Sequence, residues 1–536
     1  MSATKMKKAI SKTRLFLAAM AAMALLLPAT AHAAAPGITG PIFNLTAQPA
    51  YITQPDGSMV YSWGYGCTGA PSGYAPTAIS SPFCNSMQVP GPTLIVTEGQ
   101  TVTVILTNGL PTAAGNTSIL FPGFSVTSPA GSGVTGLLTQ EAAPGGTVTY
   151  AFTAGTPGTR AYYSGTQGDL QVEMGLYGAI IVLPASNPTG CTTVGSVPAH
   201  YVAPGNSPEV DFRLAAAAYD HTKSCYDREY LFQFSEMDPD IHNKALAQVS
   251  DPVRVNACTA SATGPGCSLN VPTEPYHPAY FMINGRSMPD DMDPNYAPEY
   301  PHQPYNGNPH MHPGEQVLLR VIGQGRWQHP FHEHGNHVRI LGRDGNLILS
   351  QTDPNSLAGP LLFTTTTTPG LAFDGIFYWT AKGLNWDAYG HSATSSDPLA
   401  TLPCVPDANG YNTGAPTALN YYEWCQDHNK PVQSAPFGDV ASGGPVTLPD
   451  ANILTNGAWY GGSPYLGPNA TVRATGPTGT TPPSGTIANS PTGEAGFAFM
   501  WHSHNEREIT TNNIFPGGML MMMLVDSREF VINESN

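Results

Sequence analysis

Apolar and polar residues alternate along the stretch that begins at Val89. Residues 93–108 read Thr-Leu-Ile-Val-Thr-Glu-Gly-Gln-Thr-Val-Thr-Val-Ile-Leu-Thr-Asn. Alternate side chains of a strand point to opposite faces, and Glu98-Gly99 interrupts the pattern, so this stretch predicts strand, turn, strand. Similar runs at 147–154 and at 180–182 predict two further strands, without helical periodicity between them. This half of the chain therefore predicts a Greek-key β-sandwich of about 150 residues.

The second half repeats the strand pattern with more interruption. Expected strands are 280–286, 316–322, 338–341, 347–350, 376–379, 496–504 and 518–525, and one short helix is expected at 238–249. The segment 385–492 is rich in Gly, Pro, Asn and Ser but also contains Trp and Tyr, so we expect a structured insertion rather than a linker. The expected parts are a leader at 1–33, a first domain at 40–185, a connector at 186–275 and a second domain at 276–530. A third, degenerate domain inside 386–492 stays open.

The first 33 residues have the pattern of an export signal. Five basic residues precede an apolar run at 15–27, which is followed by the small-x-small site Ala31-His32-Ala33. The apolar run is too short to span a bilayer, and no later stretch is apolar for long enough. We therefore expect an exported protein without a membrane span, in the periplasm or the extracellular space.

The chain is acidic and poor in charge. It has 21 basic and 37 acidic residues, and without the leader 16 basic residues remain against the same 37, a net charge of −21. Such a charge disfavours nucleic acid and anionic membranes as partners and favours cations. Charged residues make only 11% of the chain, which suits a turn-rich β protein with a Thr, Ser, Asn and Gly surface.

Eight cysteines are expected to form four disulfides, because an even number in an exported chain favours bridges. Pairing neighbours in sequence is the simplest hypothesis, though 105 pairings are formally open. The expected pairs are Cys67–Cys84, Cys191–Cys225, Cys258–Cys267 and Cys404–Cys425.

Two His-x-His pairs are the strongest chemical signal. His332 and His334 are two residues apart on an expected strand, so both imidazoles leave the same face, and His502 and His504 repeat this arrangement. If the two strands are neighbours, four imidazoles converge, a ligand set that suits copper or zinc. The alternative is four histidines scattered over surface loops. His310 and His312 form a weaker pair, for which an exposed strand end is the simpler interpretation.

The residues around these pairs resemble the last cupredoxin domain of a multicopper oxidase. The segment at 329–335 reads His-Pro-Phe-His-Glu-His-Gly, where the family has His-Pro-x-His-x-His-Gly. The segment at 502–508 reads His-Ser-His-Asn-Glu-Arg-Glu, where the family has His-Cys-His-x-x-x-His, and Gly518-Met519 follows. By this resemblance, His329 matches a mononuclear (blue) copper ligand. Ser503 and Glu508 replace its cysteine and histidine partners, and Ser503 is unable to give the copper–thiolate bond of such a centre.

Residues 89–178 resemble the first domain of the same family. The shared features are the Pro-Gly-Pro opening at 90–92, Asn108-Gly109-Leu110, Thr117-Ser118-Ile119 and Gly175-Leu176-Tyr177-Gly178. The family's two His-x-His pairs of this domain would fall on Leu120, Pro122, Tyr163 and Gly165, so its four ligands are lost. The resemblance implies an all-β fold of tandem cupredoxin-like Greek-key β-sandwiches with a long loop-rich insertion.

Three functions remain open at this point. The first is an exported oxidoreductase of multicopper oxidase type that acts at a reduced histidine copper site without a blue-copper centre. The second is a non-catalytic copper-binding or copper-sequestering protein, and the third is a structural, partner-binding protein on the same scaffold. The candidate metal ligands are His332, His334, His502, His504 and His329, with one or two copper ions rather than four, and zinc as the other metal. A partner redox protein and a homo-oligomer stay open as partners.

Overall fold

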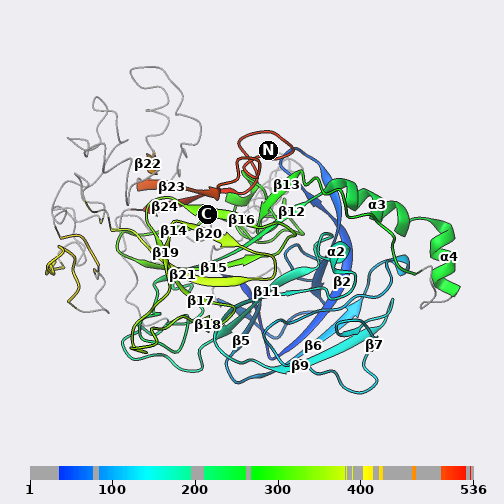
Figure 1. Ribbon diagram of the computed structural model, residues 1–536, viewed down its shortest axis with the longest axis horizontal. Helices are drawn as coiled ribbons and strands as arrows, with labels where there is room; N and C mark the ends of the chain where they lie inside the picture. The colour runs from blue at the N-terminus through cyan, green and yellow to red at the C-terminus, as the bar shows by residue number, and fades with distance from the viewer. Residues whose placement is uncertain are drawn as a thin grey trace, which may run out of the picture.

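The computed structural model describes residues 35–76, 84–194, 210–260, 267–380, 402–414, 422–425, 462–465 and 496–526, with 382, 389, 420 and 532. Two β-sandwiches lie side by side, the first in blue and cyan and the second mostly in green and red in Figure 1. The expected leader at 1–33 and most of the expected insertion at 385–492 lie outside the described residues.

The first sandwich consists of a five-stranded and a four-stranded sheet. The five-stranded sheet has the spatial order β10 (Gly158–Tyr163), β11 (Tyr177–Leu183), β5 (Leu94–Thr97), β1 (Gly37–Thr39) and β4 (Tyr74–Ala75). The four-stranded sheet has the order β3 (Met59–Cys67), β2 (Ile42–Thr53), β6 (Thr101–Asn108) and β9 (Thr147–Thr153). A ribbon of β7 (Val134–Thr135) and β8 (Gln140–Glu141) lies beside them.

The alternation seen in the sequence sets the inner face of the four-stranded sheet. In β6, Val102, Val104 and Leu106 are fully buried, whereas the residues between them are partly exposed. They pack against Leu94 and Ile180 of the facing sheet in one hydrophobic core. The predicted strand, turn, strand around Glu98 is confirmed, but β5 and β6 belong to different sheets.

The second sandwich contains both histidine segments. One sheet has the order β13 (Tyr280–Ile283), β12 (Arg228–Met237), β15 (Gln316–Gly323), β21 (Ala372–Tyr378), β17 (Val338–Arg343) and β18 (Asn346–Leu347), and β19 (Leu361–Leu362) also pairs with β17. The facing sheet has the order β14 (His310–Met311), β24 (Leu520–Asp526), β23 (Gly496–Ser503), β16 (His329–Glu333) and β20 (Thr364–Thr367), and β22 (Gly462–Tyr465) also pairs with β23. Phe232, Phe331, Trp501 and Met521 pack between the two sheets.

Strand β12 differs from the expectation, because it lies inside the segment that the sequence indicated as a connector. It runs parallel to β15 and is buried along its whole length. Its apolar residues Tyr230, Phe232 and Phe234 face the core of the second sandwich. Its other face touches the first sandwich, where the Tyr177 hydroxyl donates to Ser235 Oγ at 2.8 Å. Both faces of β12 are buried, and polar residues lie on one of them. The pattern expected for a strand with one exposed face therefore did not reveal it.

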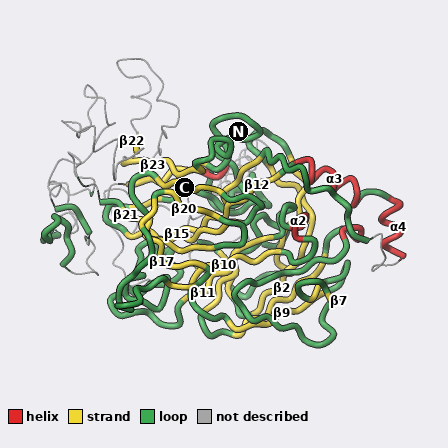
Figure 2. The backbone as a smooth tube through the Cα atoms, in the orientation of Figure 1, coloured by secondary structure: helices red, strands yellow, loops and turns green. Residues whose placement is uncertain are grey.

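Helices α3 (Pro239–Val249) and α4 (Pro252–Ala260) lie at one end of the molecule, drawn in red at the right of Figure 2. The other helical segments of the described ranges are the short helix α2 (Gly168–Gln171) and the 3-10 turns η1 (Thr112–Ala114) and η2 (Asp290–Met292). The predicted helix at 238–249 is confirmed as α3. Asp238 caps it by accepting from Asp240 N at 3.0 Å, and Pro239 occupies the first helical position. None of the helices in the described ranges is long and apolar enough to cross a membrane.

Buried charges join the two sandwiches. Arg320 on β15 donates to Glu229 at 2.8 Å and lies 3.5 Å from Asp374 on β21. Asp374 in turn accepts from the backbone N–H and hydroxyl of Thr159 on β10, at 3.1 and 2.6 Å. A buried ion is costly unless it is paired and hydrogen-bonded, so these contacts fix how the two sandwiches meet.

All four expected disulfides are confirmed: Cys67–Cys84, Cys191–Cys225, Cys258–Cys267 and Cys404–Cys425. The last of these lies in the described part of the insertion, where Tyr411 packs against Trp424 with ring centroids 5.0 Å apart. Disulfides persist in oxidising compartments, which agrees with an exported protein.

Candidate metal centre

The two histidine segments lie on neighbouring antiparallel strands. His332 on β16 is directly opposite His502 on β23, so the two side chains leave the same face of the sheet. His334 and His504 follow the ends of these strands, and the His504 N–H donates to the Pro330 carbonyl at 2.8 Å. The spacing of two residues within each pair keeps all four imidazoles on that face.

The four imidazoles converge. Ring centroids are 4.8 Å apart for His332 and His334, 4.7 Å for His332 and His504, and 5.5 Å for His332 and His502. His334 and His502 lie 5.2 Å apart by centroid, with their Nε2 atoms 3.3 Å apart. Ring nitrogens of His332, His334 and His502 fall within 4.8 Å of one another. We call His332, His334, His502 and His504 the histidine cluster.

Hydrogen bonds orient two of these rings. His502 Nδ1 lies 2.7 Å from the Ser503 carbonyl oxygen, so Nδ1 carries the proton and donates, and Nε2 turns its lone pair toward His334. His332 Nδ1 lies 2.6 Å from the hydroxyl of Thr364 on β20. Burial lowers the pKa of His332 to about 4, helped by the neighbouring imidazoles, and burial also lowers the pKa of His502. Both rings are therefore neutral at pH 7, the form that binds metals.

A pocket of about 350 Å³ opens onto the histidine cluster. Its lining residues all belong to the second sandwich: His332, Glu333, Gly335, Asn336, His337, Phe363, Thr364 and His504. The Phe363 side chain is 53% exposed and meets the His332 ring edge-on at 5.8 Å. A small molecule is able to reach the cluster from solvent by this route.

Glu333 lies between two histidines in sequence but has different surroundings. It is fully buried and accepts from the Thr365 hydroxyl at 2.8 Å. Burial raises the pKa of this carboxyl to about 8, so it is protonated at neutral pH.

His329 lies between two carboxylates. Its Nδ1 is 2.8 Å from Glu508 Oε2, and its Nε2 is 2.9 Å from Glu236 Oε2. Burial alone would lower the pKa of this imidazole, but the two carboxylates overcome that effect and raise the pKa to about 9. The ring is therefore an imidazolium at neutral pH, with both N–H groups donating. We call His329, Glu236 and Glu508 the imidazolium clamp.

These residues do not fit a mononuclear blue-copper centre. Both ring nitrogens of His329 are bonded to carboxylates, and the Ser503 hydroxyl donates to Glu508 Oε2. Met519, which follows the second histidine segment, is fully buried in the hydrophobic core of the second sandwich. No thiolate is available at this position, because all eight cysteines are in disulfides.

The positions that correspond to the family's first-domain ligands do lie together. Leu120 and Tyr163 form an isolated bridge, and a Cβ added to Gly165 would lie 2.7 Å from the Leu120 side chain. These backbone segments of the first sandwich lie together, without histidines at the corresponding positions.

One sequence interpretation is wrong. His310 and His312 were expected at an exposed strand end, but both are buried, with 5% and 0% of their surface exposed. The backbone N–H of His310 donates to the Tyr230 hydroxyl at 2.9 Å, and the backbone N–H of His312 donates to Glu315 at 2.7 Å. His310 lies on β14, which pairs with β24 at the edge of its sheet, and a two-residue pattern does not reveal that both histidines are buried.

Sequence reasoning also missed three residues near the site. Glu236 lies 93 positions before His329, on the strand expected as connector. Thr364 begins a run of threonines, and nothing in the local sequence indicates that this run pairs with β16. Phe363 is the residue before it. Residues 364–367 are all threonine, so no alternation of apolar and polar residues indicated the strand β20.

Part of the chain is similar in sequence to known proteins. Residues 80–187 match the family model described as multicopper oxidase. The chain is 36% identical over 121 residues to laccase abr2 of Aspergillus fumigatus, and 40% identical over 96 residues to L-ascorbate oxidase of Brassica rapa subsp. pekinensis. These matches cover 22% and 18% of the chain, and the chain spans only 19% and 16% of the two relatives.

Solved structures with a similar chain path include the multicopper oxidase mgLAC and the blue copper oxidase from Nitrosomonas europaea. The TM-scores are 0.42 and 0.40, with 14% sequence identity in both cases. The alignments cover 92% and 90% of this chain, and 87% and 85% of the two other chains.

Proposed function

We propose that this chain is an exported copper-binding oxidoreductase of the multicopper oxidase family, without a blue-copper centre. Its metal site is the histidine cluster, and a substrate or a partner redox protein delivers electrons to that cluster directly. Export is supported by the four disulfides and by the leader-like residues 1–33.

The convergence of the four imidazoles carries this proposal. His332 and His502 are cross-strand neighbours. The pKa values of both imidazoles are lowered, so both rings are neutral before a metal binds. Imidazole nitrogens are ligands that copper and zinc both accept. A bound copper would supply one-electron redox chemistry, which zinc lacks, and the similarity to multicopper oxidases favours copper.

The residues of the site have different roles. The metal is held by His332, His334, His502 and His504. The Ser503 carbonyl and the Thr364 hydroxyl fix ring orientation through Nδ1 of His502 and His332. The pocket beside Phe363 admits a small substrate and leaves it within reach of the cluster.

We propose that the histidine cluster binds one or two copper ions per chain. The first-sandwich positions Leu120, Pro122, Tyr163 and Gly165 contain no histidine, so the four ligands of that side are missing. The imidazolium clamp occupies the mononuclear position without a metal. The substitution of Ser503 for the cysteine removes the usual entry point of electrons, and this supports direct reaction at the cluster.

Metal analysis of the purified protein tests the site. We expect copper near one or two ions per chain, and His332→Ala or His502→Ala should remove it while the circular dichroism spectrum stays unchanged. His277→Ala, a change at an exposed histidine outside the cluster, is the matched control and should keep the copper. Wild-type copper content in both cluster variants would refute the assignment.

A non-catalytic copper-binding role is the second candidate, favoured by the same loss of the cysteine at 503. Oxygen consumption separates the two functions. With a small organic reductant, the copper-loaded protein should consume O₂ faster than the His502→Ala variant at equal total copper. Equal rates would leave copper sequestration as the function of the site.

A further inference from the structure

The position of the mononuclear centre is not a vacant metal site, because another cation is built into it. We propose that the His329 imidazolium replaces the metal ion there. Held between Glu236 and Glu508, it acts as a fixed cation that positions the Ser503 segment, and with it His502 and His504. This inference concerns a positioning residue and holds whether or not the histidine cluster turns over a substrate.

The clamp joins three segments that are distant in sequence. Glu236 is near the end of β12, His329 begins β16, and Glu508 follows β23. The ring offers its two N–H groups in opposite directions, so each carboxylate bonds a different nitrogen, at 2.8 and 2.9 Å. The side chains of all three residues are buried, with at most 1% exposed. A metal ion would need a ring nitrogen that is not protonated, and this geometry leaves none.

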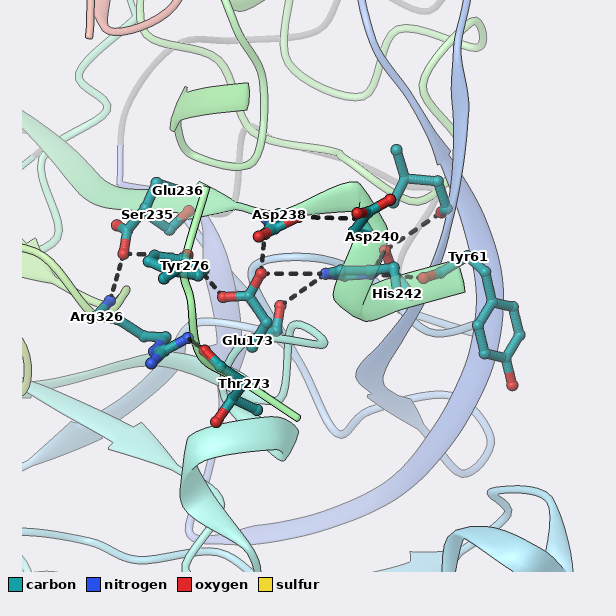
Figure 3. A network of polar contacts seen from close by, with 12 residues as sticks. Tyr61, Glu173, Ser235, Glu236, Asp238, Asp240, His242, Thr273, Tyr276 and Arg326 are labelled. Atoms are coloured by element: carbon teal, nitrogen blue, oxygen red, sulfur yellow. Dashed lines mark hydrogen bonds and ion pairs between the residues drawn. The ribbon is translucent and has the colours of Figure 1, made fainter. Parts of the chain in front are cut away.

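Glu236 is held in place from its other side, as Figure 3 shows. Its Oε1 accepts from the backbone N–H of Arg326 at 2.6 Å and of Trp327 at 2.8 Å, and the Tyr276 hydroxyl lies 3.3 Å away. Tyr276 also donates to Glu173 Oε2 at 2.7 Å, which continues the network into the first sandwich. These contacts hold the Glu236 carboxyl group in place, with Oε2 at hydrogen-bond distance from His329.

Glu508 connects the imidazolium to the histidine cluster. Its Oε1 accepts from Asn505 Nδ2 at 2.8 Å, and its Oε2 accepts from both His329 and the Ser503 hydroxyl. Ser503 lies between His502 and His504 in sequence, and its carbonyl oxygen accepts from His502 Nδ1. The imidazolium therefore fixes Glu508, Glu508 fixes Ser503, and Ser503 fixes the orientation of a proposed metal ligand.

The charges around the ring account for its protonation. Glu236 comes from β12, Glu508 from the segment after β23, and Thr367 of β20 offers a hydroxyl that bonds the His329 carbonyl at 3.3 Å. Behind Glu236, Tyr276 and Arg326 are the next polar side chains. Two carboxylates at hydrogen-bond distance outweigh the cost of burying one cation, a balance that fails if either carboxylate is removed.

Nitrogen-15 NMR of histidine-labelled protein at about pH 8 tests the proposal directly, since an ordinary histidine is neutral at that pH. We expect one imidazole with both nitrogens protonated, whose signals are absent in His329→Gln and are shifted in Glu508→Gln. The second variant identifies the signals even if the first does not fold. A spectrum in which every imidazole of the wild-type protein has one unprotonated nitrogen would overturn the proposal.

Copper loading distinguishes a positioning residue from a ligand. We expect His329→Gln to keep the wild-type number of copper ions per chain, with copper affinity lowered roughly 10-fold because the Ser503 segment shifts. Glu508→Gln added to His329→Gln should recover part of the lost melting temperature, since it removes the uncompensated carboxylate. Loss of one copper per chain in His329→Gln, with unchanged circular dichroism, would show that His329 is a ligand and refute the clamp.

Discussion

Alkaline pH should destabilise the wild-type protein through His329. The pKa of this imidazole is about 9 in the folded protein, against 6.5 for an unperturbed histidine. Since the folded state holds the proton more tightly, the contribution to stability is fully present below about pH 6.5. It is lost as the pH rises through about 9, and above that value it is absent.

The size of the effect follows from the difference in pKa. The shift from 6.5 to about 9 corresponds to about 3 kcal/mol, at about 1.4 kcal/mol for each pKa unit. The His329 side chain is fully buried, so solvent does not screen its ion pairs. A loss of that size is a large fraction of the ~5–15 kcal/mol that stabilises a typical folded domain.

Urea denaturation monitored by tryptophan fluorescence, repeated from about pH 6 to about pH 10, measures this contribution. The free energy of unfolding should fall with pH more steeply in the wild type than in His329→Gln, by about 3 kcal/mol over the range. Other titrating groups contribute to both proteins and cancel in the difference. His277→Gln, at an exposed histidine, should keep the wild-type profile. Parallel profiles for wild type and His329→Gln would refute the reasoning.

Two further substitutions test other parts of the structure. Thr364→Val removes the hydroxyl beside His332 Nδ1 and should weaken copper binding roughly 10-fold in a competition titration. Thr366→Val, on the same strand but exposed, should leave the affinity unchanged, and equal losses would contradict this. Arg320→Met leaves Glu229 and Asp374 without their buried cation and should cost about 3–5 kcal/mol in chemical denaturation. The partly exposed Arg254→Met is its control, and a loss below about 1 kcal/mol for Arg320→Met would refute the structural role.

The fold class and the four histidines of the proposed metal site were readable from local patterns. The alternation at 101–108 predicted which side chains of β6 enter the core, because a strand turns successive side chains to opposite faces. The same rule placed His332 with His334, and His502 with His504, before any strand partner was known. A short helix was expected at 238–249 and is α3, and the four disulfides were expected from cysteines that are neighbours in sequence.

The neighbours of each strand were decided by tertiary structure. Only the pairing of β16 with β23 brings the two histidine pairs together, and Glu236 reaches His329 from a strand 93 positions earlier. Local sequence fixes the face on which a side chain lies, whereas the contact of two faces depends on how the sheets pack around their cores. For this reason the sequence alone identified the histidine cluster as a metal site to be tested, and the fold revealed that His329 pairs with carboxylates.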